Sequence, residues 1–136
     1  MQAKISFISQ LESLVFAEKF IKDLLANSKY SKELSSDIHI VVLEAIVNAI
    51  LHGNRMNPKK FVYVIGKIED GKALFTIRDE GKGFDFMALA DPTTKENIES
   101  PKGRGVFLMN KLAKKVTFLD KGRIVNIEFE LKKSKI

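Results

Sequence analysis

The stretch Ile77-Arg78-Asp79-Glu80-Gly81-Lys82-Gly83-Phe84-Asp85 decides how the rest of the chain is interpreted. The apolar run before it predicts a strand that ends on an acid followed by two glycines. Glycine adopts backbone angles closed to other residues and lets a ligand approach the main chain closely. A carboxylate at the strand end can accept a hydrogen bond from the amino group of a flat ring. Asp and Gly are also ordinary turn residues, so the motif alone leaves a plain turn open.

A polar stripe interrupts the long apolar helix that is predicted upstream. This helix begins between Ser31 and Asp37 and ends near His52. Glu44, Asn48 and His52 recur every four residues and therefore share one side of the helix. A carboxylate among aliphatic residues is costly to bury without a partner or water. These side chains either lie at the rim of the core or line a polar cleft cut into it.

A second glycine motif follows downstream. The polar stretch 85–102 has little apolar patterning, and a loop of this length is typical of a lid or a binding loop. Lys102-Gly103-Arg104-Gly105 then leads into an apolar helix ending near Lys115. Such an entry offers free backbone N–H groups and the positive end of the helix dipole to phosphate. The alternative is a flexible hinge before a core helix.

The remaining patterns predict strands and one further helix. The helix runs from Gln10 to Leu25, with Ser9 as a candidate cap. The strands are expected at 4–9, 61–68, 73–78, 116–119 and 124–131, with hairpin turns at 69–72 and 120–123. No repeat or linker is evident, so residues 1–136 are expected to form a single domain.

Composition excludes several classes of protein. The chain has no cysteine, which excludes disulfides and cysteine-bound zinc and fits a reducing cytoplasm. Two histidines are too few for a histidine-rich metal site. The N-terminus lacks an apolar signal core, and no stretch reads as a membrane span. We therefore expect a cytoplasmic protein with no membrane partner.

The net charge of +6 has two interpretations. One is a solvated, lysine-rich surface. The other is attraction to anions, namely nucleotide phosphates, an acidic partner or nucleic acid. Few aromatic residues interleave with the basic clusters at 111–115 and 132–135, so direct nucleic-acid binding has little support.

The ordered set of motifs resembles the ATP-binding domain shared by gyrase B, the heat-shock chaperone ATPases and sensor histidine kinases. The Glu44–Gly53 run looks like the N box of that superfamily, 79–83 like its first glycine box and 103–105 like its second. Residues 48–54 and 104–109 make the chain most similar to small bacterial anti-sigma factors that are also serine-protein kinases. The resemblance covers residues 5 to 131. It implies an α/β (α+β) two-layer sandwich of the Bergerat type, with a mixed, mostly antiparallel sheet and helices on one face.

The resemblance also implies roles for individual residues. Asn48 matches the residue that holds Mg²⁺, which needs few protein ligands because phosphates and water complete its shell. Glu44 matches the catalytic base. Asp79 matches the acid that binds the adenine amino group. The expected nucleotide-binding set is completed by the close-packing glycines and the phosphate cradle with its flanking charges: Gly81, Gly83, Lys102, Gly103, Arg104 and Gly105.

The implied function is that of an ATP–Mg²⁺-dependent serine-protein kinase. By resemblance it phosphorylates an antagonist protein of the anti-anti-sigma type and binds a sigma factor or similar regulator, and the family commonly forms homodimers. The alternative is an ATP-sensing partner switch with little or no transfer activity, against which Glu44 argues. A two-component kinase is disfavoured because the chain has no room for a helical hairpin bearing a phosphorylatable histidine.

The last hairpin departs from the family pattern. The family often has Gly-Thr there, with the threonine helping the acid hold adenine. The matching run here is Gly122-Arg123-Ile124, which lacks a hydroxyl. Asn126 is a candidate replacement.

Overall fold

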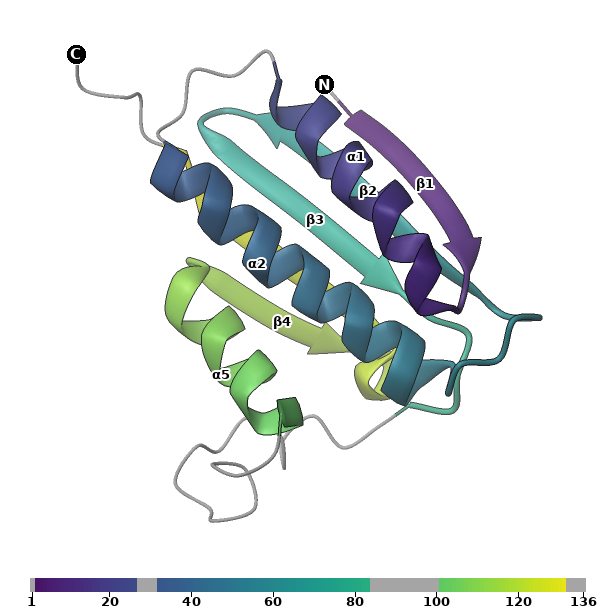
Figure 1. The fold of residues 1–136 in the computed structure, drawn as a ribbon. Coiled ribbons are helices and arrows are strands. Elements are labelled where there is room, and N and C mark those ends of the chain that lie inside the picture. Colours follow the sequence, from purple (N-terminus) through teal and green to yellow (C-terminus); the bar gives the residue numbers. More distant parts are fainter. Residues whose placement is uncertain (1, 27–31, 84–100, 132–136) are drawn as a thin grey trace.

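The computed structural model describes residues 2–26, 32–83 and 101–131. In this part of the chain one sheet carries helices on a single side (Figure 1). The elements follow in the order β1 (Gln2–Ile8), η1 (Leu11–Ser13), α1 (Leu14–Leu25), α2 (Lys32–Asn48), η2 (Ala49–Gly53), β2 (Phe61–Glu69), β3 (Lys72–Arg78), α5 (Pro101–Leu112), β4 (Lys115–Leu119), η3 (Asp120–Gly122) and β5 (Ile124–Glu130).

The sheet has the strand order β1-β2-β3-β5-β4. Each neighbouring pair is antiparallel, so the sheet is uniformly antiparallel over the described strands rather than mixed. The helices α1, α2 and α5 lie together on one face (Figure 1). The predicted two-layer α+β sandwich with helices on one face is therefore confirmed.

The turn between β2 and β3 shows why the sequence fixes this register. Asp70 and Gly71 have φ values of 50° and 73°, as a two-residue hairpin turn that matches the strand twist requires. The turn pairs Glu69 with Lys72 and Ile77 with Val64. It therefore sets the position at which β3 ends and Asp79 begins the next segment.

Alternation along the strands places the core between the sheet and the helices. Val62, Val64, Phe75 and Ile77 are buried on the helix side of β2 and β3. Phe75 meets Phe129 of β5 edge to face, with ring centroids 6.2 Å apart, an arrangement that aromatic pairs favour. From α2 the buried residues are Ile38, Val41, Val42, Ala45 and Ile46.

The helix that forms the centre of this layer is more apolar than the sequence reading allowed. By length and composition alone, Leu34–Gly53 would be able to cross a membrane. Its buried residues pack into the core cluster that contains the strands, and a core helix passes the same test of length and composition. The expectation that no stretch has the composition of a membrane span was therefore wrong.

Two local details differ from expectation. Ser9 does not cap a helix, because its hydroxyl donates to the Lys60 carbonyl at 2.7 Å and the helical segment starts only after Gln10. The helix that carries Asn48 ends in a π-helical turn, in which the Asn54 N–H donates to the Ala49 carbonyl at 2.8 Å. Turns of this kind occur frequently at functional sites.

Candidate functional site

Asn48 and Asp79 line the same pocket on the helix side of the sheet. The pocket lies between α2, α5 and the neighbouring ends of β3 and β5, and its free volume is about 10 Å³, room for about one water molecule. A purine ring therefore requires the pocket to widen. The described residues that line it are Ala45, Asn48, Ala49, Ile77, Asp79, Met109, Phe118, Gly122, Arg123 and Val125.

Asn48 contributes a buried amide with an unmet donor. Its side chain is 5% exposed, and Nδ2 has no hydrogen-bond partner within the described part of the chain. Buried polar groups normally have partners, since an unmet one costs about 1–3 kcal/mol. An amide at this position is suited to a polar ligand that enters the pocket.

Asp79 contributes a carboxylate directly after β3. Burial raises its pKa, while the Gly81 N–H and the charges of Arg123 and Lys60 act to lower it and Asp120 acts to raise it. The Gly81 N–H donates to Oδ1 at 2.8 Å. The raised pKa indicates that the charged form lacks enough compensation here. A ligand amino group that donates a hydrogen bond to the carboxylate would stabilise its charged form.

Two glycines let the end of the N-box helix pack against the first glycine box. A Cβ on Gly53 would overlap the Asp79 carboxylate, and a Cβ on Gly81 would overlap the Gly53 carbonyl. These glycines therefore allow close packing within the chain, between the helix end and the Asp79 turn. Gly83 has a φ of 89°, a conformation that favours glycine.

Asn54 is a buried polar residue for which the sequence predicts no individual role. It is 2% exposed, and its Oδ1 accepts the Glu80 N–H at 2.7 Å. Its Nδ2 donates to Ser9 Oγ at 2.7 Å and to the Phe61 carbonyl at 3.0 Å. The amide therefore joins β1, β2 and the segment that follows Asp79. An asparagine after a helix-ending glycine is so common that the pattern carried no distinguishing signal.

Arg123 is the second residue whose contacts the sequence does not predict, and Asn126, the candidate replacement for the family's threonine, lies on the other face of the sheet. Asn126 Oδ1 accepts the Thr76 hydroxyl at 2.8 Å, and both residues line a depression on the other face of the sheet. Asn126 therefore cannot replace the missing threonine. Arg123 lines the pocket instead, and its Nε donates to the Gly81 carbonyl at 2.8 Å.

Glu44 lies one helical turn before Asn48 but is not among the described residues that line the pocket. It is half-buried, and burial raises its pKa. A carboxylate with a raised pKa is a better proton acceptor than a free one at neutral pH. The structure gives it no ion pair within the described residues.

The second glycine box lies in α5, which begins at Pro101. Gly103 therefore belongs to the first turn, whose backbone N–H groups have no partner within the helix, and Gly105 lies beyond it. Nothing is described of the side chains of Lys102 and Arg104. The predicted lid, 85–102, falls outside the described residues except at its last two positions.

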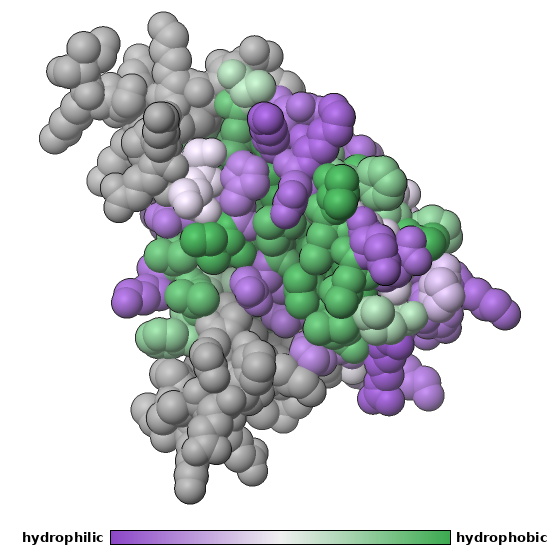
Figure 2. Space-filling model, viewed as in Figure 1, coloured by the Kyte–Doolittle hydropathy of each residue, from purple (hydrophilic) through white to green (hydrophobic). Residues whose placement is uncertain are grey.

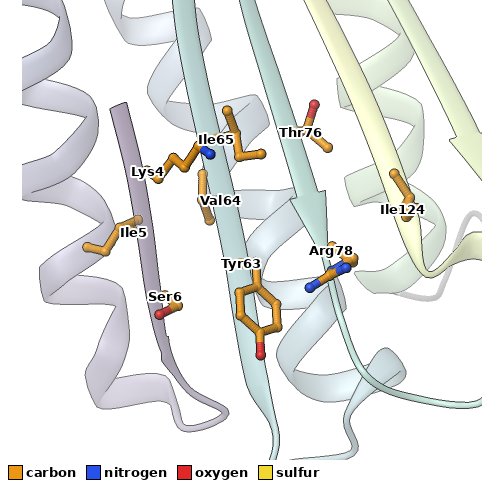
Figure 3. Close-up of a pocket in the computed structure, with 9 residues that line it drawn as sticks. All are labelled: Lys4, Ile5, Ser6, Tyr63, Val64, Ile65, Thr76, Arg78 and Ile124. Carbon is orange, nitrogen blue, oxygen red and sulfur yellow. The ribbon is translucent and has the colours of Figure 1, made fainter. Parts of the chain in front are cut away.

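A larger depression lies on the opposite, open face of the sheet. Its volume is about 460 Å³, and none of the predicted site residues line it. Figure 3 shows Tyr63 and Arg78 side by side there, with the guanidinium carbon 4.5 Å from the ring centroid. This depression and the predicted site residues therefore lie on different faces of the sheet.

Comparisons with known proteins agree with the motifs. The chain matches the histidine kinase-like ATPase domain over residues 7–129. A relative from Bacillus cytotoxicus named anti-sigma F factor is 34% identical, with 94% of this chain and 84% of the relative covered. One of the same name from Geobacillus sp. is 33% identical, with 99% and 94% covered.

A solved structure agrees with the fold. The RsbU and RsbW domains of a Mycobacterium tuberculosis protein match with a TM-score of 0.68 at 14% identity, over 100% of this chain and 33% of that one. At this identity the likeness concerns the fold. The family match, in contrast, covers the N box and the first glycine box that meet at the pocket. The chain belongs to the histidine kinase-like ATPase domain family.

Proposed function

We propose that this chain binds ATP with Mg²⁺ and transfers the terminal phosphoryl group to a serine of an antagonist protein. The observation that carries the proposal is the meeting of Asn48 and Asp79 in one pocket. One offers a buried amide with an unmet donor, and the other a buried carboxylate with a raised pKa. Both groups cost free energy while the pocket is empty, and both can form hydrogen bonds with a bound ligand.

The nucleotide would lie with its base against Asp79. The carboxylate accepts a hydrogen bond from the adenine amino group, and Gly81 and Gly83 keep side chains away from the ring. The N–H groups of the first turn of α5 suit phosphate. Opening of the narrow pocket between α2 and α5 is part of binding.

The residues present fit a magnesium ion. Asn48 would hold it through the side-chain oxygen, with phosphate oxygens and waters as the other ligands. Bound there, the ion supplies charge neutralisation for the phosphates. Glu44, one turn away on the same helix, is suited to accept the proton of the attacking serine hydroxyl.

The name of the relatives, anti-sigma F factor, supports a sigma factor as one partner. The other proposed partner, an antagonist of the anti-anti-sigma type, comes from the family resemblance. Val15 and Phe16 on α1 and Ile40 on α2 are exposed apolar residues, and apolar side chains gather at the centre of the helix side (Figure 2). Such a surface is suited to protein contact. Homodimer formation and a cytoplasmic location belong to the same proposal.

The test combines binding with transfer. The wild-type chain is captured on a support with proteins from its source cell, with and without Mg–ATP, and phosphosites on the captured antagonist are mapped. Glu44→Gln should abolish serine phosphorylation while calorimetry still detects Mg–ATP binding. Glu18→Gln removes an exposed helical carboxylate and should leave both unchanged. Transfer at the normal rate in Glu44→Gln would contradict the assignment of the base.

The second candidate is an ATP-sensing partner switch without transfer. The position of Glu44 favours it, because this carboxylate is not among the described residues lining the pocket. It predicts Mg–ATP-dependent partner binding and an unmodified antagonist. Calorimetry that detects no uptake of adenine nucleotide would exclude both candidates.

A further inference from the structure

Arg123 occupies a position for which the family pattern offers no arginine. It follows η3 and precedes β5, at the edge of the pocket that contains Asp79 and Asn48. Its side chain is 30% exposed, so the guanidinium is partly withdrawn from water. The Arg123 side chain lies toward the pocket instead of extending into water. Its contacts there indicate what it does.

The contacts of Arg123 converge on the turn that carries Asp79. Its backbone carbonyl accepts the Asp79 N–H at 2.9 Å. Its Nε donates to the Gly81 carbonyl at 2.8 Å, and Nη2 donates to the Lys82 carbonyl at 3.3 Å. Arg123 therefore contacts three of the four residues of the 79–82 turn, namely Asp79, Gly81 and Lys82.

The guanidinium is itself oriented before it reaches the turn. Nη1 donates to Asp120 Oδ1 at 3.0 Å. The planar fork of arginine can hold several acceptors at once in a fixed geometry, which a lysine ammonium on its flexible stem cannot reproduce. The turn needs such support because Gly81 and Gly83 have no side chains with which to anchor themselves.

The opposite side of the turn is held independently. Asn54 Oδ1 accepts the Glu80 N–H at 2.7 Å, and the Asn54 amide is fixed in turn by Ser9 and Phe61. The turn therefore lies between two anchors, Asn54 from the helix end and Arg123 from the last hairpin. Asn54 is almost fully buried, whereas Arg123 is the anchor that borders the pocket.

We propose that Arg123 is a positioning residue for recognition of the nucleotide base. It holds the 79–82 turn in the shape that presents the Asp79 carboxylate to the amino group of adenine, in place of the threonine that the family often uses at this point. The inference rests on the proposed nucleotide site and adds the residue that sets its base preference.

The test measures base preference rather than affinity alone. Calorimetry compares Mg–ATP with the Mg complex of purine riboside triphosphate, which lacks the amino group, for the wild-type chain, Arg123→Lys and Arg123→Gln. The ratio of the two dissociation constants does not depend on the fraction of folded protein. We expect the wild-type chain to favour ATP, and both variants to lower this preference by about tenfold. Lys121→Gln removes a neighbouring exposed charge and should preserve the ratio.

The outcomes separate this inference from the function on which it rests. A wild-type chain that binds neither triphosphate removes the nucleotide site itself. A wild-type chain that prefers ATP, with the same preference in both arginine variants, overturns the role of Arg123 only. A preference lost in Arg123→Gln and kept in Arg123→Lys would show that charge suffices and would overturn positioning by the fork.

Discussion

The two faces of the sheet differ in how their polar groups are satisfied. On the open face, the depression of about 460 Å³ includes polar side chains that already have partners: Arg78 lies over the Tyr63 ring, and the Thr76 hydroxyl donates to Asn126. On the helix face the pocket of about 10 Å³ holds an unpartnered amide and a carboxylate with a raised pKa. Unmet polar groups, rather than free volume, are therefore the reason to place the candidate site on the helix face.

Adjacent residues place this contrast within one segment. Asp79 lines the pocket on the helix side. The Glu80 carboxylate instead accepts the Phe61 N–H at 2.7 Å and lies 3.5 Å from the Tyr63 hydroxyl. Two neighbouring carboxylates therefore belong to different environments, which allows each to be removed as the control for the other.

The largest expected effect is on nucleotide binding by Asp79→Asn. The variant loses the acceptor charge for the adenine amino group, and calorimetry should show affinity for Mg–ATP lower by about 100-fold. Glu80→Gln removes the neighbouring charge and should bind normally. Equal losses of Mg–ATP affinity in the two variants would contradict the assignment of nucleotide binding to Asp79 on the helix face.

The same variant should not lose stability. Burial raises the pKa of Asp79, so the folded chain binds more protons than the unfolded chain above about pH 4, the ordinary value for aspartate. The Asp79 contribution to the free energy of unfolding therefore falls as pH rises through that window. Asp79→Asn removes this fall, so thermal unfolding at several pH values should show the variant gaining stability relative to the wild-type chain as pH rises through the window. A relative stability that falls with pH would mean that the carboxylate is stabilised by its surroundings.

The next largest effect is expected for Gly53→Ala. The added methyl group would overlap the Asp79 carboxylate, and such overpacking costs about 1–3 kcal/mol of stability. Binding of Mg–ATP should weaken as well, because the carboxylate must move. Gly71→Ala provides a comparison at an exposed turn with a φ of 73°, where stability should fall while binding persists. Normal binding by Gly53→Ala would show that Asp79 tolerates displacement.

A smaller effect, on stability first, is expected for Asn54→Ala. Removal of the amide leaves the Glu80 N–H and Ser9 without their buried partner, at a cost of about 2 kcal/mol in the free energy of unfolding. Denaturant unfolding measures this loss. Asn57→Ala, in a more exposed turn where the side chain accepts the Lys59 N–H, should cost less than half as much. Equal losses in the free energy of unfolding would show that Asn54 does not hold the 79–82 turn.

The smallest effect is expected on the open face. Arg78→Ala removes the cation over the Tyr63 ring, which is worth about 0.5–1 kcal/mol, and calorimetry should show unchanged Mg–ATP affinity. A loss of affinity comparable to that of Asp79→Asn would mean that the open face takes part in nucleotide binding.

The elements were predictable because strand alternation and helical spacing report directly on burial. The hairpin at Asp70 and Gly71 was recognised from turn chemistry, and β2 and β3 lie within one residue of their predicted bounds. The meeting of Asn48 and Asp79 was foreseen from the resemblance rather than from spacing, because residues 31 positions apart meet only through the fold.

The hydrogen-bond partners were not predictable, because they depend on tertiary placement. Ser9 was read as a helix cap, yet its hydroxyl joins Lys60 and Asn54. Asn126 was considered for the pocket, yet alternation along β5 directs Val125 to the pocket and Asn126 to the other face. The sequence shows only that Arg123 stands in a run that lacks the hydroxyl common in the family. A hydropathy pattern shows which face of a helix or strand is buried. The partner of a polar side chain depends on which other element packs against that face.

The π-helical turn Ala49–Gly53 has a consequence for how insertions and deletions would act on this chain. Each residue of an α-helix rotates the next by about 100°. Deleting one residue from the turn would restore ordinary winding and leave Asn48 in place. It would also remove the i→i+5 bond from the Asn54 N–H to the Ala49 carbonyl, next to the side chain that accepts the Glu80 N–H. The extra residue acts as a spacer between two amides of one helix end, Asn48 in the pocket and Asn54 on the Glu80 N–H.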